Sequence, residues 1–301
     1  MWNDILDDIN TQISKGTTMK HNKLKRIFSG MGTVLAVLIF GYLIVRPSHL
    51  RWGATDKEVS RAMPGDLTGA RWTRVITIQA TPEQIWPWLV QWGQGRGGWY
   101  SYDWLENLLG FDIHTAAHIL PEYQNPKIGD PICMAANVCT SFVSMIEPNQ
   151  WFGWQASDEN GKPVWNFVFG LFPVDETHTR LVVRESFDPN AMPSAVITMI
   201  EIPDVVMELK ALDTVKNRAE GRVESGLTTI SEIAIWLAAF LIGLAAGVLF
   251  VQRANGIRFL AIGAASVMVL LVLTFLFPAL WLRGMLVLGL LVALLWRSRR
   301  D

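Results

Sequence analysis

The sequence is short of charged residues and of cysteine. Only 18% of its 301 residues are charged, whereas an average soluble domain carries about 25%. The 26 Lys and Arg nearly balance the 27 Asp and Glu, which argues against a nucleic-acid binder, because such proteins carry a strongly basic surface. Two cysteines are too few for a disulfide scaffold or a four-cysteine zinc site. Since half of the residues are hydrophobic, a disordered chain is excluded as well.

Several catalytic and cofactor signatures are also missing. The sequence has no Gly-x-Ser-x-Gly and no His-Glu-x-x-His. The run 93–98 (GQGRGG) has the spacing G-x-G-x-x-G, but it follows an expected helix, whereas a dinucleotide-binding loop leaves a strand and opens a helix. Asp112, His114 and His118 do not have the spacing of a known metal site. The sequence therefore predicts neither a cofactor nor a bound metal.

What the sequence does contain is long apolar runs. A helix needs about 20 apolar residues to cross a bilayer, and three runs of about this length carry almost no charge, while a fourth contains Arg283 near its start. A buried core helix could explain one such run but not four. We therefore predict an α-helical transmembrane part of about four helices, at residues 27–46, 230–252, 258–277 and 279–296.

Basic residues predict the orientation of these spans, because Lys and Arg concentrate in cytoplasmic loops. They precede the first span, lie between the second and third, and follow the last: Lys20, Lys23, Lys25, Arg26, Arg253, Arg258, Arg297, Arg299 and Arg300. This places the segment 1–26 and the tail 297–301 in the cytoplasm and residues 47–225 outside a multi-pass cell membrane protein. The first run is longer than a signal peptide's apolar region, so a retained anchor is expected. Whether Met1 or Met19 is the true start stays open.

The overall charge balance hides a division between these parts. Residues 47–225 hold 14 Lys and Arg against 22 Asp and Glu, a net charge of −8, and the rest of the chain carries +7. The sequence thus predicts an acidic soluble domain at 47–225 joined to basic membrane flanks.

Residues 47–225 read as an α+β domain. The alternating, β-branched stretch 71–79 predicts a strand, and Thr81-Pro82-Glu83-Gln84 predicts the start of a helix. A short helix is expected at 102–109, and a long one at 194–222 with a kink at Pro203. Between these helices, strands separated by turn residues predict an antiparallel sheet, at 131–135, 140–146, 151–155, 164–172 and 180–187.

Aromatic and polar side chains gather around the glycine-rich run. Aromatic rings with a polar atom suit the wall of an apolar pocket, although each of them could equally fill the core. Asp103, Glu106 and His114 are weak candidates for general acid or base chemistry. The candidate ligand-binding residues are Arg96, Trp99, Tyr100, Tyr102, Asp103, Trp104, Glu106, His114, Trp165 and Phe169.

The two cysteines flank a possible hairpin tip. Cys133 and Cys139 would then lie close enough to form a disulfide, and an extracytoplasmic location would permit their oxidation. Two buried free thiols are the alternative.

Several motifs resemble the bacterial START-like proteins, also called SRPBCC or polyketide cyclase/dehydrase and lipid-transport-like proteins. The resemblance covers roughly residues 51–222 and is carried by 51–56 (RWGATD), 63–66 (MPGD), 81–91 (TPEQIWPWLVQ), 95–107 (GRGGWYSYDWLEN), Pro121-Glu122, Gly129-Asp130 and 207–210 (MELK). It implies a helix-grip fold, in which a curved antiparallel sheet surrounds a long carboxy-terminal helix and encloses an apolar cavity. Because this superfamily serves many functions, the resemblance implies no catalytic residue.

Three functions remain open from the sequence. The leading hypothesis is a membrane-anchored domain that binds a lipid or another apolar small molecule as a carrier or sensor. The second is a cyclase-type enzyme that acts on a polyketide-like substrate. The third is a structural or sensory module that contacts another, unidentified membrane protein. A binding protein is favoured over an enzyme.

Overall fold

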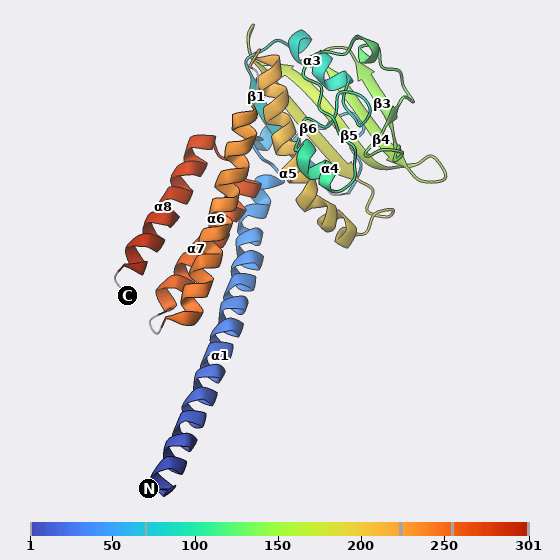
Figure 1. Cartoon of the computed structure of the whole chain (residues 1–301). Helices are drawn as coiled ribbons and strands as arrows, with labels where there is room; N and C mark the ends of the chain where they lie inside the picture. Colours follow the sequence, from blue (N-terminus) through green and yellow to red (C-terminus); the bar gives the residue numbers. More distant parts are fainter. Residues whose placement is uncertain (1, 70, 223–224, 254–255, 300–301) are drawn as a thin grey trace. The chain divides into compact units, whose positions relative to one another are not determined.

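The structure is a computed structural model that describes residues 2–69, 71–222, 225–253 and 256–299 (Figure 1). The chain divides into two compact units. One unit, the membrane unit, is formed by Met1–Arg46 together with Gly226–Asp301. The other, the soluble unit, is formed by Pro47–Ser225.

The membrane unit contains four helices that are long and apolar enough to cross a membrane. The first lies at His21–His49, within the longer helix α1 (Trp2–His49), so the predicted segment 1–26 and span 27–46 share one helix. The others are α6 (Gly226–Gln252), α7 (Ile257–Phe275) and α8 (Leu280–Ser298).

Small residues bring α6 and α7 close together. The Ser266 hydroxyl of α7 donates a hydrogen bond of 2.5 Å to the carbonyl oxygen of Ala239 in α6. A Cβ atom on Gly243 would lie only 3.0 Å from this hydroxyl oxygen. Such close approach of backbones is typical of packed membrane helices.

The soluble unit is α+β, as expected, with a six-stranded sheet in which every neighbouring pair is antiparallel. The strand order is β1-β6-β5-β4-β3-β2. The strands are β1 (Arg71–Ile78), β2 (Pro131–Ile132), β3 (Ser141–Glu147), β4 (Trp151–Ser157), β5 (Pro163–Pro173) and β6 (Thr179–Phe187). The helices are α2 (Asp56–Ser60), α3 (Pro82–Val90), α4 (Asp103–Leu108), α5 (Ser194–Ala219) and the 3-10 helix η1 (Pro121–Tyr123).

Local sequence explains most of these boundaries. Thr81 and Gln84 form the expected capping box at the start of α3, with Pro82 in the first turn. The sequence did not predict α2, although Thr55 and Glu58 form a second capping box there. The expected strand 131–135 is shorter, because after β2 the chain turns into a small loop closed by a bridge between Ala135 and Val138.

The structure joins Cys133 and Cys139 by a disulfide across this loop. Their Cα atoms lie 3.9 Å apart.

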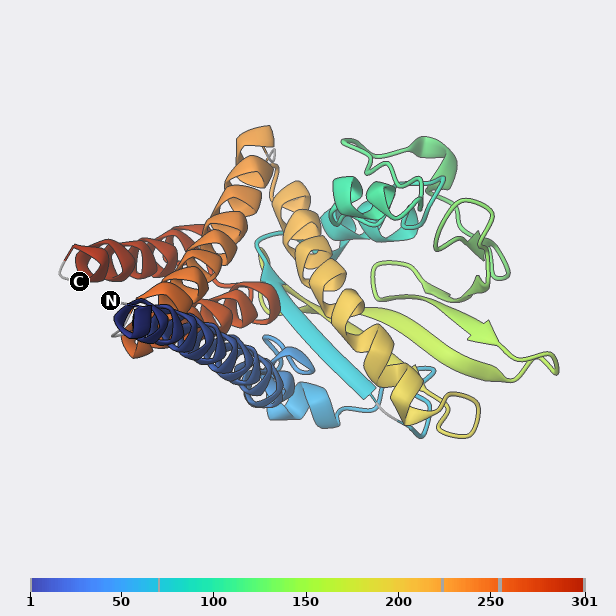
Figure 2. The ribbon, with the colours of Figure 1, turned by 60° about the horizontal axis from the view of Figure 1, so that its bottom comes forward.

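Both faces of the sheet are covered, so its strands do not show a simple alternation of buried and exposed residues. In β6, Leu181, Val183 and Glu185 point to the inner face, while Val182 and Arg184 point to the outer one. Figure 2 shows α5 lying along the sheet beside β1. Helix α3, α5 and the chain after α3 cover the inner face. Whether the sheet is curved in the manner of a helix grip stays a prediction.

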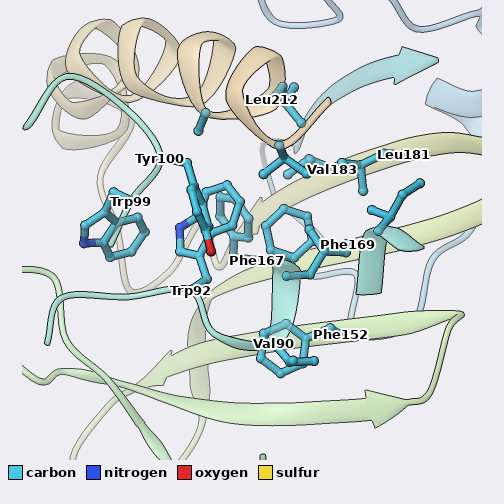
Figure 3. Packing of buried hydrophobic residues seen from close by; sticks show 14 of the residues in the cluster. Val90, Trp92, Trp99, Tyr100, Phe152, Phe167, Phe169, Leu181, Val183 and Leu212 are labelled. Atoms are coloured by element: carbon cyan, nitrogen blue, oxygen red, sulfur yellow. The ribbon is translucent and has the colours of Figure 1, made fainter. Parts of the chain in front are cut away.

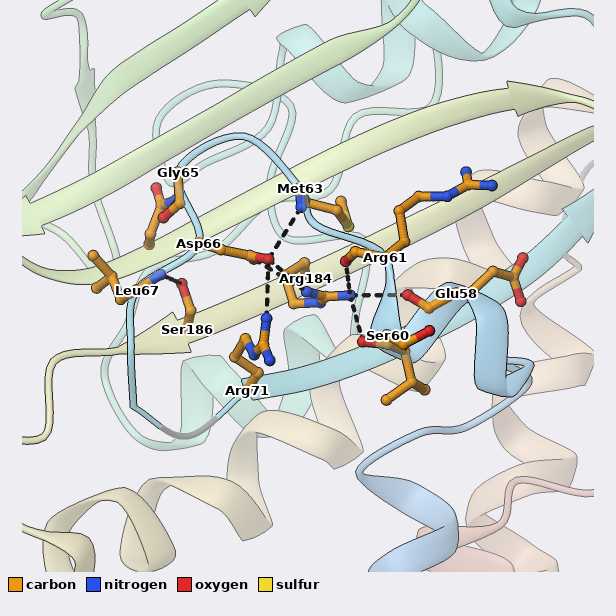
Figure 4. Close-up of polar contacts among 12 residues, drawn as sticks. Glu58, Ser60, Arg61, Met63, Gly65, Asp66, Leu67, Arg71, Arg184 and Ser186 are labelled. Carbon is orange, nitrogen blue, oxygen red and sulfur yellow. Dashed lines mark hydrogen bonds and ion pairs between the residues drawn. The ribbon is translucent and has the colours of Figure 1, made fainter.

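The segment 54–69 covers the outer face, and a buried arginine is among the residues that hold it there (Figure 4). Arg184 donates from Nη1 to both carboxylate oxygens of Asp66, at 3.1 and 2.9 Å, and from Nη2 to the carbonyl oxygen of Glu58 at 2.9 Å. Asp66 also accepts a bond from the backbone N–H of Met63. The motif 63–66 (MPGD) therefore has a structural role in this protein.

Candidate functional site

The inner face of the sheet carries a dense aromatic cluster (Figure 3). The rings of Trp92, Trp99 and Trp154 form a triangle with centroid separations of 6.2 to 6.4 Å. Phe167 stacks on Trp154 at 4.5 Å, with an interplanar angle of 6°. Phe169 packs against Trp92 at 4.9 Å. We call this group the aromatic cluster.

The three indole N–H groups of this triangle have no hydrogen-bond partner among the described residues. All three side chains are buried, with at most 7% of their surface exposed. A buried indole N–H usually finds an acceptor, and leaving one unpaired costs about 1–3 kcal/mol. The aromatic cluster therefore holds three buried donors that no described residue pairs.

The glycine-rich loop places two of the cluster's residues. Gly93, Gly95 and Gly98 have positive φ angles of 121°, 72° and 81°, which favour glycine. Gly93 and Gly98 pair with each other, so the loop folds back on itself and directs Trp99 into the interior. This geometry explains the spacing G-x-G-x-x-G without a nucleotide.

Tyr100, next in the chain, has a φ of 56°, a strained value for a residue that is not glycine. Its hydroxyl accepts a 2.8 Å hydrogen bond from the buried amide of Gln91. Burial raises the pKa of Tyr100, although the Gln91 bond acts in the opposite direction. This phenol therefore stays neutral, and it ties the loop to the end of α3.

A second group on the inner face is charged, and we call it the charged cluster. Arg74 of β1 donates from Nη1 to Asp204 at 2.8 Å and to Glu208, both on α5. Glu185 of β6 lies 3.6 Å from the same Nη1 atom and accepts a 2.8 Å bond from the indole of Trp165. Arg74 is fully buried, and the cluster reaches solvent at Asp204, whose side chain is 23% exposed.

Burial dominates the electrostatics of the charged cluster. It raises the pKa of Glu208 to about 7, against the attraction of Arg74. It also raises the pKa of Asp204, and it raises that of Glu185 well above its ordinary value. Burial by itself would lower the pKa of Arg74, but the attraction of the surrounding carboxylates is larger and raises this pKa. The cluster therefore holds a permanent cation among carboxyl groups that bind protons more readily than exposed carboxyl groups do.

Donors and acceptors remain unpaired side by side in this cluster. Arg74 uses Nε for the carbonyl oxygen of His49, at 3.0 Å, and Nη1 for the carboxylates, but Nη2 has no partner among the described residues. Oε1 of Glu208 is likewise buried without a partner. A neutral group that both accepts and donates, such as a hydroxyl, matches these atoms.

The three carboxyl groups could be considered as metal ligands, since one oxygen of each lies within 4.8 Å of the others. However, Arg74 contacts all three of them. A divalent cation there would lie beside a buried guanidinium, so the donor set does not suit a metal.

The two clusters lie in one row across the sheet. Strand register pairs Glu185 of β6 with Phe167 of β5, and Phe167 with Trp154 of β4. Two strand spacings correspond to about 10 Å. Phe167, a member of the aromatic cluster, therefore lies next to Glu185 of the charged cluster on the inner face of the sheet.

Some of the candidate residues from the sequence come together in this interface. Trp99, Tyr100 and Phe169 belong to the buried core cluster. Trp165 packs against the aromatic cluster at 6.1 Å from Phe167 and reaches the charged cluster through Glu185.

Other candidates lie elsewhere. His114 is exposed and contacts Asp112 at 3.0 Å, and Trp104 is 47% exposed. Arg96 donates to the carbonyl oxygen of Val90 and lies over the Tyr123 ring. Asp103 accepts two hydrogen bonds from Thr115, which fix α4 to the following loop. Tyr102 lies at 5.9 Å from the ammonium of Lys210.

Glu106 on α4 differs from the other acidic candidates. Its side chain is buried, and neither carboxylate oxygen makes a hydrogen bond of ordinary geometry to any described residue. Burial raises the pKa of Glu106 to about 7, while the nearby hydroxyl of Ser101 lowers it in part. This carboxyl group could exchange a proton near neutral pH.

Sequence reasoning missed the charged cluster. The signal was present, because Arg74 falls on the same strand face as Trp72 and Ile76. On α5, Glu201, Asp204 and Glu208 recur at spacings of three and four, which places them on one face of the helix.

Comparisons with known proteins give distant structural likenesses only. No protein-family model and no curated protein sequence matches the chain. Similar solved structures include a protein from Thermobifida fusca (13% identity, 52% of this chain and 97% of that chain, TM-score 0.31) and the Zhui aromatase/cyclase from Streptomyces sp. R1128 (15%, 52% and 96%, TM-score 0.28). A third is the Aha1 dimer from Colwellia psychrerythraea (15%, 49% and 96%, TM-score 0.27). Likenesses at this level support no inference about ligand or activity.

Proposed function

We propose that the soluble unit binds a neutral amphiphilic small molecule between α5 and the sheet, as a membrane-anchored carrier or sensor. The observation that carries this proposal is the triangle of buried indoles whose three N–H groups lack an acceptor. An apolar molecule with a carbonyl, ether or hydroxyl oxygen would supply that acceptor and bury its apolar surface against the rings.

The charged cluster narrows the class of ligand. Nη2 of Arg74 would donate to a ligand oxygen, and a ligand hydroxyl would donate to Oε1 of Glu208. A cationic group would be repelled by the Arg74 guanidinium, and an anionic one would be repelled by the carboxyl groups of Asp204 and Glu208 when these are ionised. A hydroxyl-bearing molecule with an apolar body is therefore the ligand that both ends of the row favour.

Four naphthalenes with different substituents test this proposal on the full chain in detergent, by isothermal titration calorimetry against a detergent blank. They are 2-naphthol, 2-methylnaphthalene, 2-naphthoate and 2-naphthylmethylamine. We expect 2-naphthol to bind about tenfold or more tightly than 2-methylnaphthalene, because a hydrogen bond to a charged group contributes about 1.5–3 kcal/mol. We expect both charged probes to bind more weakly than 2-naphthol.

Variants separate the two ends of the site. Trp154→Phe removes one unpaired N–H and should weaken the oxygen-bearing probe 2-naphthol, whereas Trp104→Phe, a change at an exposed ring, should leave binding unchanged. Glu208→Gln should reduce the preference for 2-naphthol over 2-methylnaphthalene. Absence of binding by every probe would overturn the binding site. Equal binding of the two neutral probes would overturn only the polar end.

We also infer that the soluble unit lies on the extracytoplasmic side, in agreement with the basic residues that flank the spans. The disulfide between Cys133 and Cys139 supports this side, because it is the oxidising one. An epitope inserted in the exposed turn at Asn160 should be detected by antibody on intact cells. Detection only after permeabilisation would place the unit in the cytoplasm.

A cyclase-type enzyme is the second candidate function, and Glu106 is the observation that favours it. A buried carboxyl with a pKa near 7 suits a general acid or base at neutral pH. Such a step would close a ring on a bound polyketide-like chain. Glu106→Gln should abolish turnover of a linear poly-β-ketone probe while Glu122→Gln, at an exposed carboxyl, leaves it intact. Equal product distributions with and without protein would dismiss this function.

A further inference from the structure

The amino-terminal half of α5 has apolar side chains on the face turned away from the core. Val196, Met199, Ile200 and Ile202 are 38 to 77% exposed. Ile197 and Glu201 on the other face are buried, so the half-helix is already docked on the soluble unit. We call the four exposed residues the α5 apolar face. Figure 2 shows these turns extending past the end of β1.

Three of the four residues of this apolar face lie in a stretch without charge. Residues 189–200 (PNAMPSAVITMI) contain no charged side chain, although the soluble unit as a whole carries −8. No charged group of the face would therefore have to leave water on contact with hydrocarbon. In contrast, most of this acidic unit would be repelled by anionic lipid headgroups. Its composition suits the interfacial region of a bilayer.

The chain itself keeps this face near a bilayer. The soluble unit begins at Pro47, inside the helix that contains the first candidate span, and ends at Ser225, one residue before α6. Tethering at both ends raises the effective concentration of the unit at the membrane, so even weak apolar contacts become populated. A free partner protein has no such advantage.

We propose that the α5 apolar face inserts into the lipid bilayer that the same chain spans, and so docks the soluble unit on the membrane surface. Pro203 directly follows the part of α5 that carries this face, and it removes one helical hydrogen bond there. Asp204, where the charged cluster reaches solvent, follows directly. Docking would therefore place the solvent-accessible edge of the proposed site next to the lipid. The docking itself does not depend on ligand binding.

Site-specific labelling of the full chain in phosphatidylcholine nanodiscs tests this docking. Met199→Cys is labelled with an environment-sensitive nitrobenzoxadiazole, and Val174→Cys in the exposed turn between β5 and β6 serves as the control. The native cysteines form a disulfide, so the introduced thiol is the reactive one. We expect a blue-shifted emission at position 199, with at least threefold stronger quenching by spin-labelled lipid than at position 174.

A second measurement avoids the label. In wild-type nanodiscs, backbone amides of 194–202 should exchange hydrogen several-fold more slowly than in Met199→Glu, while α3 exchanges equally in both. Equal lipid quenching at positions 199 and 174, together with unchanged exchange in Met199→Glu, overturns the proposal. Protection that appears only with two copies per disc assigns the face to a second copy and overturns bilayer docking as well.

Discussion

The region where α5 meets the inner face of the sheet is apolar and aromatic at one end and charged at the other. At one end, Leu209, Leu212 and Val215 of the helix belong to the same buried cluster as the stacked and edge-to-face rings. At the end formed by Asp204 and Glu208, the helix packs on a buried guanidinium. The aromatic end gains its stability from burial of apolar surface, which hardly depends on pH. The charged end depends on the proton balance of three carboxyl groups, because taking charges out of water is costly.

A change at the aromatic end should give the largest effect, and one independent of pH. Trp154→Ala removes ring contacts with Trp92, Trp99, Phe167 and Phe169. We expect a loss of about 3–5 kcal/mol in the free energy of unfolding of the soluble unit, at pH 5 and at pH 8 alike. Near-ultraviolet circular dichroism of the full chain during thermal unfolding measures it. A loss that differs strongly between the two pH values would contradict the distinction between the two ends.

The matching change at the charged end should depend on pH. Arg74→Leu leaves the carboxyls of Glu185, Asp204 and Glu208 without their cation, which should cost about 3–5 kcal/mol at pH 8. At pH 5 these groups take up protons, because burial already raises their pKa values. The destabilisation should therefore shrink well below its pH 8 value. Equal losses at both pH values would show that the cluster stays ionised throughout.

Glu106 should make the wild-type protein less stable as the pH rises. A carboxyl with a folded pKa of about 7 binds its proton more tightly than in the unfolded chain, where the value is 4.5. Its favourable contribution is complete below about pH 4.5 and is lost as the pH rises through about 7. Glu106→Gln should therefore remove up to about 3 kcal/mol of this pH dependence. Melting temperatures of both proteins between pH 4.5 and 8 provide the comparison, and parallel profiles would refute the assignment.

The smallest effect on the free energy of unfolding is expected for a conservative change at the aromatic end. Trp154→Phe keeps most of the apolar surface and removes an N–H that has no partner. We expect a change in unfolding free energy within about 1 kcal/mol, because no hydrogen bond is lost and the cavity left is small. Trp236→Phe, which removes a donor bonded to Thr274 in the membrane unit, is the informative contrast. A large loss in Trp154→Phe would indicate that its N–H does have an acceptor.

Much of the architecture follows from the sequence. The four apolar helices were recognised because length and lack of charge are local properties. The strands β1, β3, β4, β5 and β6 and the helices α3, α4 and α5 lie close to their predicted positions, since capping and alternation act over a few residues. The exceptions are short. Helix α2 has five residues, and β2 has two, too few to give a periodic pattern.

Only some residues of the candidate site could be predicted from the sequence. The sequence drew attention to Trp99, Tyr100 and Trp165 because aromatic residues are unusually dense in this domain. It could not show that Trp104 and His114 point to solvent, because a short helix or loop has no fixed buried side.

By itself, then, the sequence determined which segments are apolar and which alternate. Only the tertiary structure decided that Arg74 of β1 meets Glu185 of β6 and Glu208 of α5, residues more than 100 positions away in the chain. It also decided that Phe167 lies between the two clusters. The physical reason is that strand register and helix docking are set by long-range packing, and no local pattern specifies which inward-facing residues of separate elements become neighbours.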